Sequence, residues 1–168
     1  MFWEDAAAGT LETIFGPDTE FLGVETLRAH LDGLIEVFGA GDFDGRRVEA
    51  REGWLRLGAL GRSLGASLGY WSTFECGPAP ILEIVVRKQR DYGSENIARF
   101  GRFGLLVRVH DKIARLENLL SSGSIPNNES ILDNVIDVIG YSCVASMWEA
   151  GEFLYALQQS TVAESTLI

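Results

Sequence analysis

The sequence predicts a mainly α fold, a bundle of four to five helices, with a small β addition in the N-terminal half as an open option. Apolar residues recur at three- and four-residue spacing in several long stretches, the pattern of helices that bury one face. Glycine, proline and asparagine separate those stretches, so each helix has a place to begin or end. A short loop joins the last two long stretches, so we expect these two helices to be antiparallel neighbours.

The first helix that the pattern predicts covers residues 26–38. Its apolar positions are Leu27, Leu31, Leu34, Ile35 and Phe38. The run Gly39-Ala40-Gly41 ends it, because glycine favours helix termini. The segment before this helix, residues 1–20, is mixed and acidic, and we assign it no chemistry.

Residues 46–74 contain glycines at helical spacing, although each glycine costs a helix about 1 kcal/mol relative to alanine. Gly58, Gly61, Gly65 and Gly69 stand beside leucines along this stretch. Such a row lets another backbone approach closely, so we expect a tight internal or intersubunit helix contact. Arginines inside the run argue against a membrane span, and an irregular or β segment is the alternative.

Turn and cap residues place the remaining helices. The prolines near residue 78 predict a helix over 77–92, and a capped short helix follows over 94–100. A long helix is expected over 105–120. After a short loop, Asn127 or Asn128 is a good N-cap for the final helix.

These segments predict three parts of the chain. Residues 1–76 form an acidic, glycine-rich N-terminal extension that packs on the core. Residues 77–157 form the helical core that carries the candidate chemistry. Residues 158–168 form a tail with little periodicity, which we expect to fray.

The formal net charge of −10 is unevenly distributed. Residues 1–80 carry 6 basic and 13 acidic side chains, whereas residues 81–150 carry 8 basic and 9 acidic ones. Duplex nucleic acid is therefore not expected as a partner, because binding it needs a basic excess that displaces counterions from phosphates. A small phosphorylated ligand needs only a few local cations.

The sequence shows no signal for export or membrane insertion. The N-terminus is acidic where a signal peptide is basic, and no run of eighteen uncharged apolar residues exists. Cys76 and Cys143 make neither a disulfide framework nor a metal-ligand spacing. We therefore expect a reduced, cytoplasmic protein that does not bind membranes.

Carboxylates recur at four-residue spacing at the start of the final helix. Glu129, Asp133 and Asp137 point the same way from it, and like charges at this spacing repel unless they face water or a cation. Asp111 on the antiparallel neighbour would complete an oxygen cluster of the kind that Mg²⁺ binds. The alternative is structural, with Glu129 complementing the helix N-terminus and one aspartate paired to an arginine.

Cations and hydrogen-bonding side chains accompany these carboxylates. The cations are Lys88, Arg108, Lys112 and Arg115. Arginine makes the two-pronged contact that phosphate favours, so this set suits the outer oxygens of a triphosphate. Tyr92, Asn96 and Asn118 suit recognition of a base or a sugar hydroxyl. For each residue alone, a solvated helix face, a helix end or a cap is the alternative.

Three runs of this sequence resemble a known family. They are K-Q-R-D-Y-G-S-E-N-I-A-R-F-G at 88–101, G-L-L-V-R-V-H-D-K-I-A-R-L-E-N-L-L at 104–120 and N-E-S-I-L-D-N-V-I-D-V-I-G-Y at 128–141. Their spacing resembles the nucleotide-modification-associated domain 1 family, which is common in bacteriophages. It is also similar, more distantly, to the all-α MazG-like nucleoside-triphosphate pyrophosphohydrolases. The resemblance covers about residues 80–150 and leaves the first 75 residues unmatched.

The resemblance implies that the protein handles nucleotides, above all deoxynucleotides, with the help of Mg²⁺. It also implies an oligomer in the cytoplasm of a bacterial host cell. Carried over position by position, the motif residues are Lys88, Asp91, Tyr92, Asn96, Arg108, Asp111, Lys112, Arg115, Asn118, Glu129, Asp133 and Asp137. One position departs from the pattern. MazG-like enzymes have glutamates on the first metal helix, where this chain has Asp111 followed by Lys112 and Arg115.

The leading hypothesis is a Mg²⁺-dependent enzyme that hydrolyses the α–β bond of a nucleoside triphosphate. Asp111, Asp133 and Asp137 would hold the metal with Glu129 and activate a water. The substrate-binding set would be Lys88, Tyr92, Asn96, Arg108, Lys112, Arg115 and Asn118. One alternative is a helical module that binds a nucleotide or a protein partner without turnover. Another is a structural protein whose charged faces form internal ion pairs.

Overall fold

The computed structural model describes residues 1–17, 23–39, 45–72, 77–123, 125 and 129–159. The helices are α1 (Trp3–Ile14), α2 (Val24–Gly39), α3 (Arg47–Ser67), the 3-10 helix η1 (Tyr70–Ser72), α4 (Pro78–Tyr92), α5 (Glu95–Ala98), α6 (Gly101–Ser122) and α7 (Ile131–Ala150). The described ranges contain no strand, so the mainly helical class is confirmed. The count of four to five helices is wrong, because the described residues form seven α-helices, and the small β addition is wrong as well.

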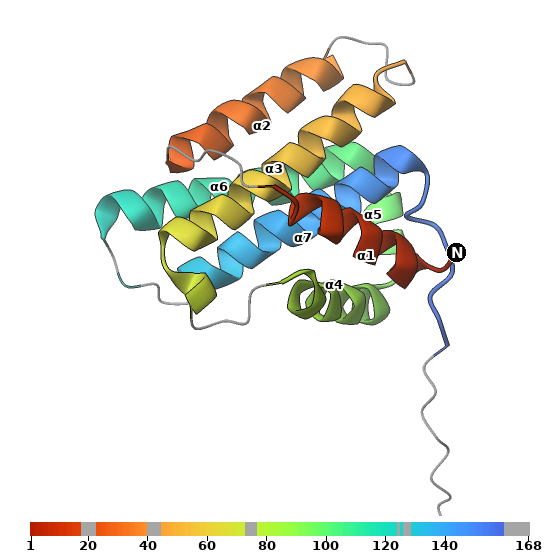
Figure 1. Cartoon of the computed structure of the whole chain (residues 1–168). Helices are drawn as coiled ribbons and strands as arrows, with labels where there is room; N and C mark the ends of the chain where they lie inside the picture. The colour runs from red at the N-terminus through yellow and green to blue at the C-terminus, as the bar shows by residue number, and fades with distance from the viewer. Residues whose placement is uncertain (18–22, 40–44, 73–76, 124, 126–128, 160–168) are drawn as a thin grey trace, which may run out of the picture.

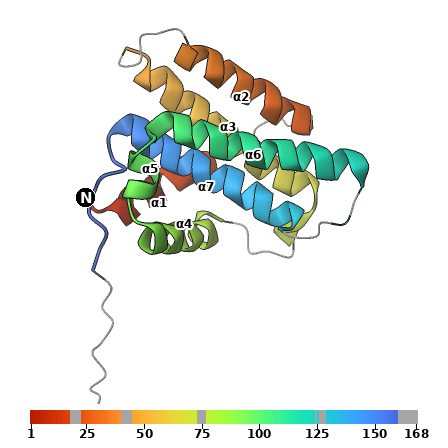
Figure 2. The same cartoon turned by 180° about the vertical axis from the view of Figure 1, so that it is seen from behind.

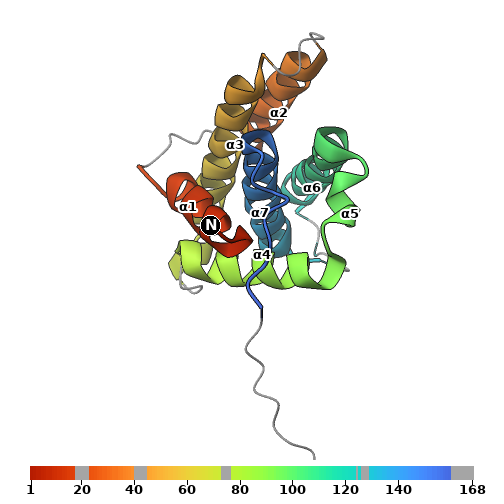
Figure 3. The same cartoon turned by 90° about the vertical axis from the view of Figure 1, so that its right-hand side faces the viewer.

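Helix α7 is the centre of this arrangement. It packs most extensively on α3 and α6, and it also contacts α1 and α4. Figure 3 shows these helices around α7, with α2 and α4 on opposite sides of it. Buried residues occupy every face of α7, and a helix that is apolar all round is expected in the interior. No helix in the described part of the chain is long and apolar enough to cross a bilayer.

The glycines of α3 explain how closely it approaches its neighbours. A Cβ at Gly61 would lie 3.1 Å from Val138 and 3.4 Å from Ile139 of α7. A Cβ at Gly58 would lie 2.8 Å from Ile14 of α1. Gly58, Gly61 and Gly65 therefore lie in a helix with internal packing contacts, whereas Gly69 follows the end of that helix with a φ of +76°. The close approach offsets the low helix propensity of these glycines.

Helix α6 lies alongside α7 and is longer than the expected 105–120. Figure 2 shows α6 running along α7, with α5 beside its N-terminal end. Gly101 begins α6 with a φ of +52°, and Trp148 of α7 lies 2.9 Å from where a Cβ would stand. A glycine is required there for both reasons, so the helix begins four residues before its expected start at residue 105.

The N-terminus of α7 differs from the expected cap. Ser130 is the N-cap and accepts a hydrogen bond from the backbone N–H of Asp133. The asparagines expected in this role, Asn127 and Asn128, lie outside the described residues. Helix α1 was not expected at all, although its buried residues recur at helical spacing.

The first helix, α1, packs against the described segment that follows α7. The rings of Trp3 and Phe153 meet edge to face with centroids 6.4 Å apart, and the ring of Trp148 of α7 also packs on Phe153, with centroids 5.8 Å apart. The N–H of Trp3 donates to the carbonyl of Ala156 at 2.9 Å. Figure 1 shows the chain after α7 passing the N-terminal end of α1. Buried residues from α1 to α7 and this segment belong to one continuous hydrophobic core.

Candidate functional site

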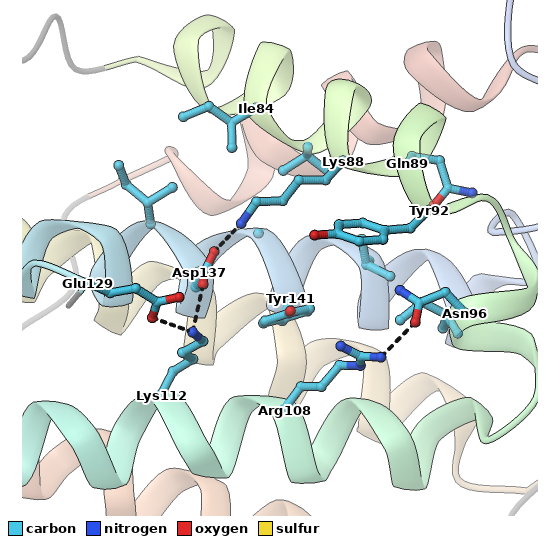
Figure 4. A pocket seen from close by; sticks show the side chains of 15 residues that line it. Ile84, Lys88, Gln89, Tyr92, Asn96, Arg108, Lys112, Glu129, Asp137 and Tyr141 are labelled. Carbon is cyan, nitrogen blue, oxygen red and sulfur yellow. Dashed lines mark hydrogen bonds and ion pairs between the residues drawn. The ribbon is translucent and has the colours of Figure 1, made fainter.

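A pocket of about 270 Å³ opens between α4, α6 and α7. Three helices contribute polar residues to it in pairs spaced four apart. The pairs are Lys88 and Tyr92 on α4, Arg108 and Lys112 on α6, and Asp137 and Tyr141 on α7. Because residues four apart share one helix face, the pairs form two tiers about one helical turn apart. Figure 4 shows both tiers, with α7 forming the floor between α4 and α6.

The ion-pair tier consists of Lys88, Lys112, Asp137 and Glu129. Both oxygens of Asp137 are engaged, because Lys88 Nζ donates to Oδ1 and Lys112 Nζ lies 3.1 Å from Oδ2. Lys112 Nζ also donates to Glu129 Oε2 at 2.7 Å. The Asp137 side chain is 11 % exposed, so this carboxylate is a buried anion shared by cations from two helices.

Lys112 keeps its positive charge in this tier. Burial by itself lowers the pKa of Lys112. The hydrogen bonds and charges of Glu129 and Asp137 outweigh burial, so the pKa of Lys112 is raised above its ordinary 10.5. The pocket therefore holds a permanent cation at neutral pH.

The aromatic tier consists of Tyr92, Asn96, Arg108 and Tyr141. The guanidinium of Arg108 donates to Asn96 Oδ1 at 2.8 Å, and its central carbon lies 5.9 Å from the centre of the Tyr141 ring. Tyr92 is exposed at the edge of the pocket and points its hydroxyl toward the ion-pair tier (Figure 4). A guanidinium with aromatic rings is a surface on which planar groups stack.

Apolar residues and one glycine shape the floor of the pocket. The apolar lining is Ile84, Val85, Ile97, Ile136 and Val144. Gly140 lies between the two tiers on α7, and a Cβ there would meet Val85 at 3.3 Å. A side chain at position 140 would therefore press on Val85 of α4.

Seven of the residues predicted from the sequence line this pocket. They are Lys88, Tyr92, Asn96, Arg108, Lys112, Glu129 and Asp137. The structure places Asp91, Asp111, Asp133, Arg115 and Asn118 outside the lining. The predicted site is therefore brought together in part, and the residues left out belong to α6, to the end of α4 and to the first turn of α7.

Four of the five excluded residues have a local reason, and the fifth, Asp91, is exposed at the end of α4. Asp133 closes a capping box, because its Oδ2 accepts from the N–H and hydroxyl of Ser130 at 2.8 and 2.7 Å. Asp111 is exposed, since it precedes Lys112 by one residue and is turned about 100° away from it. Arg115 donates to the backbone carbonyl of Glu129 at 3.4 Å, and Asn118 is exposed.

The acidic side chains do not gather as one cluster. Within the residues that the structure describes, no group of three or more His, Cys, Asp or Glu could hold a metal ion. This corrects the expected convergence of Asp111, Asp133 and Asp137, because Asp133 serves the helix cap and Asp111 faces away. Asp137 and Glu129 remain together through their common partner Lys112. Mg²⁺ bound with phosphates needs only one or two carboxylates, so this pair fits that kind of site.

Sequence reasoning missed Tyr141 and Gln89. Tyr141 continues the four-residue series that begins at Glu129, so the same spacing that indicated Asp137 could have found it. Gln89 is buried at the α4 wall and donates to Ser94 Oγ at 3.1 Å, which ties the end of α4 to the start of α5. No spacing signal distinguishes Gln89 from a surface glutamine.

The two tiers define the chemistry that the pocket can accommodate. Cations at one end suit an anionic group, and rings with a guanidinium at the other end suit a planar group. The pocket thus fits a ligand that carries both groups about one helical turn apart. In comparisons with known proteins, no family model, curated protein or solved structure matches this chain.

Proposed function

We propose that the pocket between α4, α6 and α7 binds a nucleotide, with phosphate at the ion-pair tier and the base or sugar at the aromatic tier. The observation that carries this proposal is the placement of Lys88 and Lys112 on the two oxygens of one carboxylate, next to Arg108. A phosphate presents oxygens of the same charge to the same cations. The resemblance of residues 80–150 to nucleotide-handling families supports the same ligand class, with deoxynucleotides among the ligands. The same resemblance suggests that the protein assembles as an oligomer.

The aromatic tier supports a nucleotide over a simple phosphate. Tyr92 and Tyr141 offer ring faces, and each base stacked on an aromatic ring is worth about 1–3 kcal/mol. Asn96 has an amide that can also pair with a base edge or a sugar hydroxyl. A phosphate without a base would leave this half of the pocket without a partner.

Mg²⁺-dependent hydrolysis of the bound triphosphate is a second proposal, carried by the pair of Asp137 and Glu129. These carboxylates would hold Mg²⁺ together with the phosphates, and Mg²⁺ would supply charge neutralisation and an activated water. Lys88 and Lys112 would neutralise the leaving pyrophosphate. The competing proposal is a module that binds the nucleotide without turnover.

The test is a panel of nucleoside and deoxynucleoside triphosphates, each with and without Mg²⁺. We expect at least one to raise the melting temperature of the wild-type protein. Lys112→Met should weaken its binding about tenfold or more, because a hydrogen bond to a charged group contributes about 1.5–3 kcal/mol. Arg87→Met is the matched control, since Arg87 is an exposed cation on α4 outside the pocket.

The same samples separate the alternatives. Release of pyrophosphate with Mg²⁺, detected by chromatography, would support hydrolysis, whereas stabilisation without release would support the binding module. If no nucleotide stabilises the wild-type protein, or if Lys112→Met binds as tightly as Arg87→Met, the nucleotide proposal is wrong.

A further inference from the structure

We infer that Asp137 stands in the place of the ligand's anion and competes with it, so that the pocket selects groups carrying two or more negative charges. This inference rests on the proposed nucleotide site and names its substrate class. The preferred ligands are nucleotides that end in a phosphate, and phosphate diesters such as cyclic nucleotides are excluded. The role assigned to Asp137 is that of an internal competitor.

The first step is the geometry of the shared carboxylate. Lys88 comes from α4 and Lys112 from α6, and each reaches a different oxygen of Asp137 on the floor between them (Figure 4). A ligand that binds both ammonium groups must approach the position that this carboxylate already holds. Binding is therefore an exchange of one anion for another.

The second step is the charge balance of the pocket. Its lining has three cations, Lys88, Arg108 and Lys112, and two carboxylates, Glu129 and Asp137. A monoanion that displaces Asp137 replaces one negative charge with another, so little is gained. A dianion brings an additional charge to cations that are only partly desolvated, and each charge-assisted hydrogen bond is stronger than a neutral one.

The third step concerns Arg108, which supplies the remaining positive charge. Its contacts in the described residues are neutral ones, the amide of Asn96 and the ring of Tyr141. Arg108 lies four residues before Lys112 on α6, about 5–6 Å away along the same face. A phosphate chain that starts at the two lysines would reach this guanidinium, so a diphosphate or triphosphate gains a third cation.

The expected signature is a gain of affinity when the competitor is neutralised. Asp137→Asn should bind inorganic pyrophosphate about tenfold more tightly than the wild-type protein, since the loss of two ion pairs of about 0.5–1 kcal/mol each frees the lysines. Glu83→Gln is the matched control, because it removes one carboxylate from an exposed position of α4 outside the pocket. It should leave the affinity unchanged.

The experiment is calorimetric titration of each protein with pyrophosphate, ATP, AMP and 3′,5′-cyclic AMP, all without divalent metal. In the wild-type protein, AMP should bind and cyclic AMP should not, because only AMP carries a dianionic phosphate. In Asp137→Asn, the affinity for cyclic AMP should rise about tenfold, as it does for the other anions, so that its binding becomes measurable. Glu129→Gln repeats the test at an exposed side chain that also holds Lys112, with a smaller gain expected.

The outcomes distinguish this inference from the nucleotide proposal. Suppose that the wild-type protein binds ATP, but Asp137→Asn and Glu129→Gln bind pyrophosphate no more tightly than the wild-type protein does. The competitor role is then overturned and the nucleotide site stands. If the variants bind pyrophosphate more tightly but no protein binds ATP, the competitor role stands and the nucleotide proposal is wrong. If no protein binds any of the four ligands, both are wrong.

Discussion

One arginine, Arg28, connects α2 to α6 through its side-chain contacts. Arg28 of α2 donates to both carboxylate oxygens of Glu117 on α6 at 3.0 and 2.9 Å, and its guanidinium lies 2.8 Å from His110 Nδ1. Arginine has only donors, so His110 Nδ1 is the acceptor in this contact. The hydrogen bond from Arg28 lowers the pKa of Glu117, and the same bond raises the pKa of Arg28.

The Arg28–Glu117 pair predicts a pH-dependent part of the stability. The native pKa of Glu117 lies below its ordinary 4.5, so the pair stabilises the fold above that pH and its contribution is lost as the pH falls through the native pKa. Glu117→Gln should lower the free energy of unfolding by about 0.5–1 kcal/mol at neutral pH, because both side chains are partly exposed.

Urea unfolding of wild type and Glu117→Gln at a series of pH values is the measurement. The difference between them should shrink toward zero as the solution becomes more acidic than the native pKa of Glu117. Glu36→Gln, an exposed carboxylate on α2, controls for the change in net charge. A difference that stays constant with pH would contradict the assignment.

At the scale of the helices, packing of α3 on α7 depends on the absence of side chains. The neighbours of Gly61 are the branched side chains Val138 and Ile139, which have little freedom to move. The contact between α3 and α7 therefore tolerates no added volume at this position.

Substitutions at two glycines should move stability in opposite directions. Gly61→Leu should lower the free energy of unfolding by about 1–3 kcal/mol, because overpacking forces neighbouring side chains out of their rotamers. Gly33→Ala in the exposed face of α2 has no atom within 4 Å of the new Cβ, so it should raise stability by about 0.5–1 kcal/mol. Chemical denaturation of both variants checks the signs, and a neutral Gly61→Leu would refute the close contact.

Apolar periodicity with cap and turn residues predicted α2, α4, α6 and α7, and it favoured a helix at α3 with an irregular or β segment as the alternative. Helix α1 was missed, although its buried positions Trp3, Ala6, Ala7, Thr10, Leu11 and Ile14 have the same spacing. Alanine and threonine carry little hydrophobic signal on their own. They become core residues only because α3, α4 and α7 surround them.

The site was predictable only as far as helix spacing reaches. Spacing placed Glu129 and Asp137 on one face, and both line the pocket. It could not separate Asp133 from them, but Ser130-Ile131-Leu132-Asp133 is a capping-box pattern that the sequence already contained. Asp111 was misplaced because the rotation of α6 about its axis follows from its contacts with α2 and α7, which no local pattern contains.

At the scale of the whole molecule, the segment after α7 packs against α1 and so connects the two ends of the described chain. Phe153 is 1 % exposed between Trp3 and Trp148, and the N–H of Gln158 lies 3.0 Å from a carboxylate oxygen of Glu4. Glu4 also accepts from Arg90 of α4 at 3.1 Å. This short segment therefore belongs to the core that surrounds α7.

Removal of the Phe153 ring should affect the whole fold. Phe153→Ala should lower the free energy of unfolding by about 3–5 kcal/mol, since it leaves a cavity between two tryptophans. Leu154→Ala is the control, because Leu154 is 67 % exposed, and its effect should stay within about 0.5 kcal/mol. Tryptophan fluorescence during denaturation reports both, and equal effects of the two variants would contradict this role.

Core residues and pocket residues lie on the same continuous helix, α7. Asp137 and Tyr141 face α4 and α6 while their neighbours Val138 and Ile139 meet α3. An insertion or deletion of one residue between Asp137 and Tyr141 would rotate Tyr141 and the rest of the helix by about 100° about the helix axis, relative to Asp137. The number of residues between these two positions therefore has to stay at three for both to face the pocket.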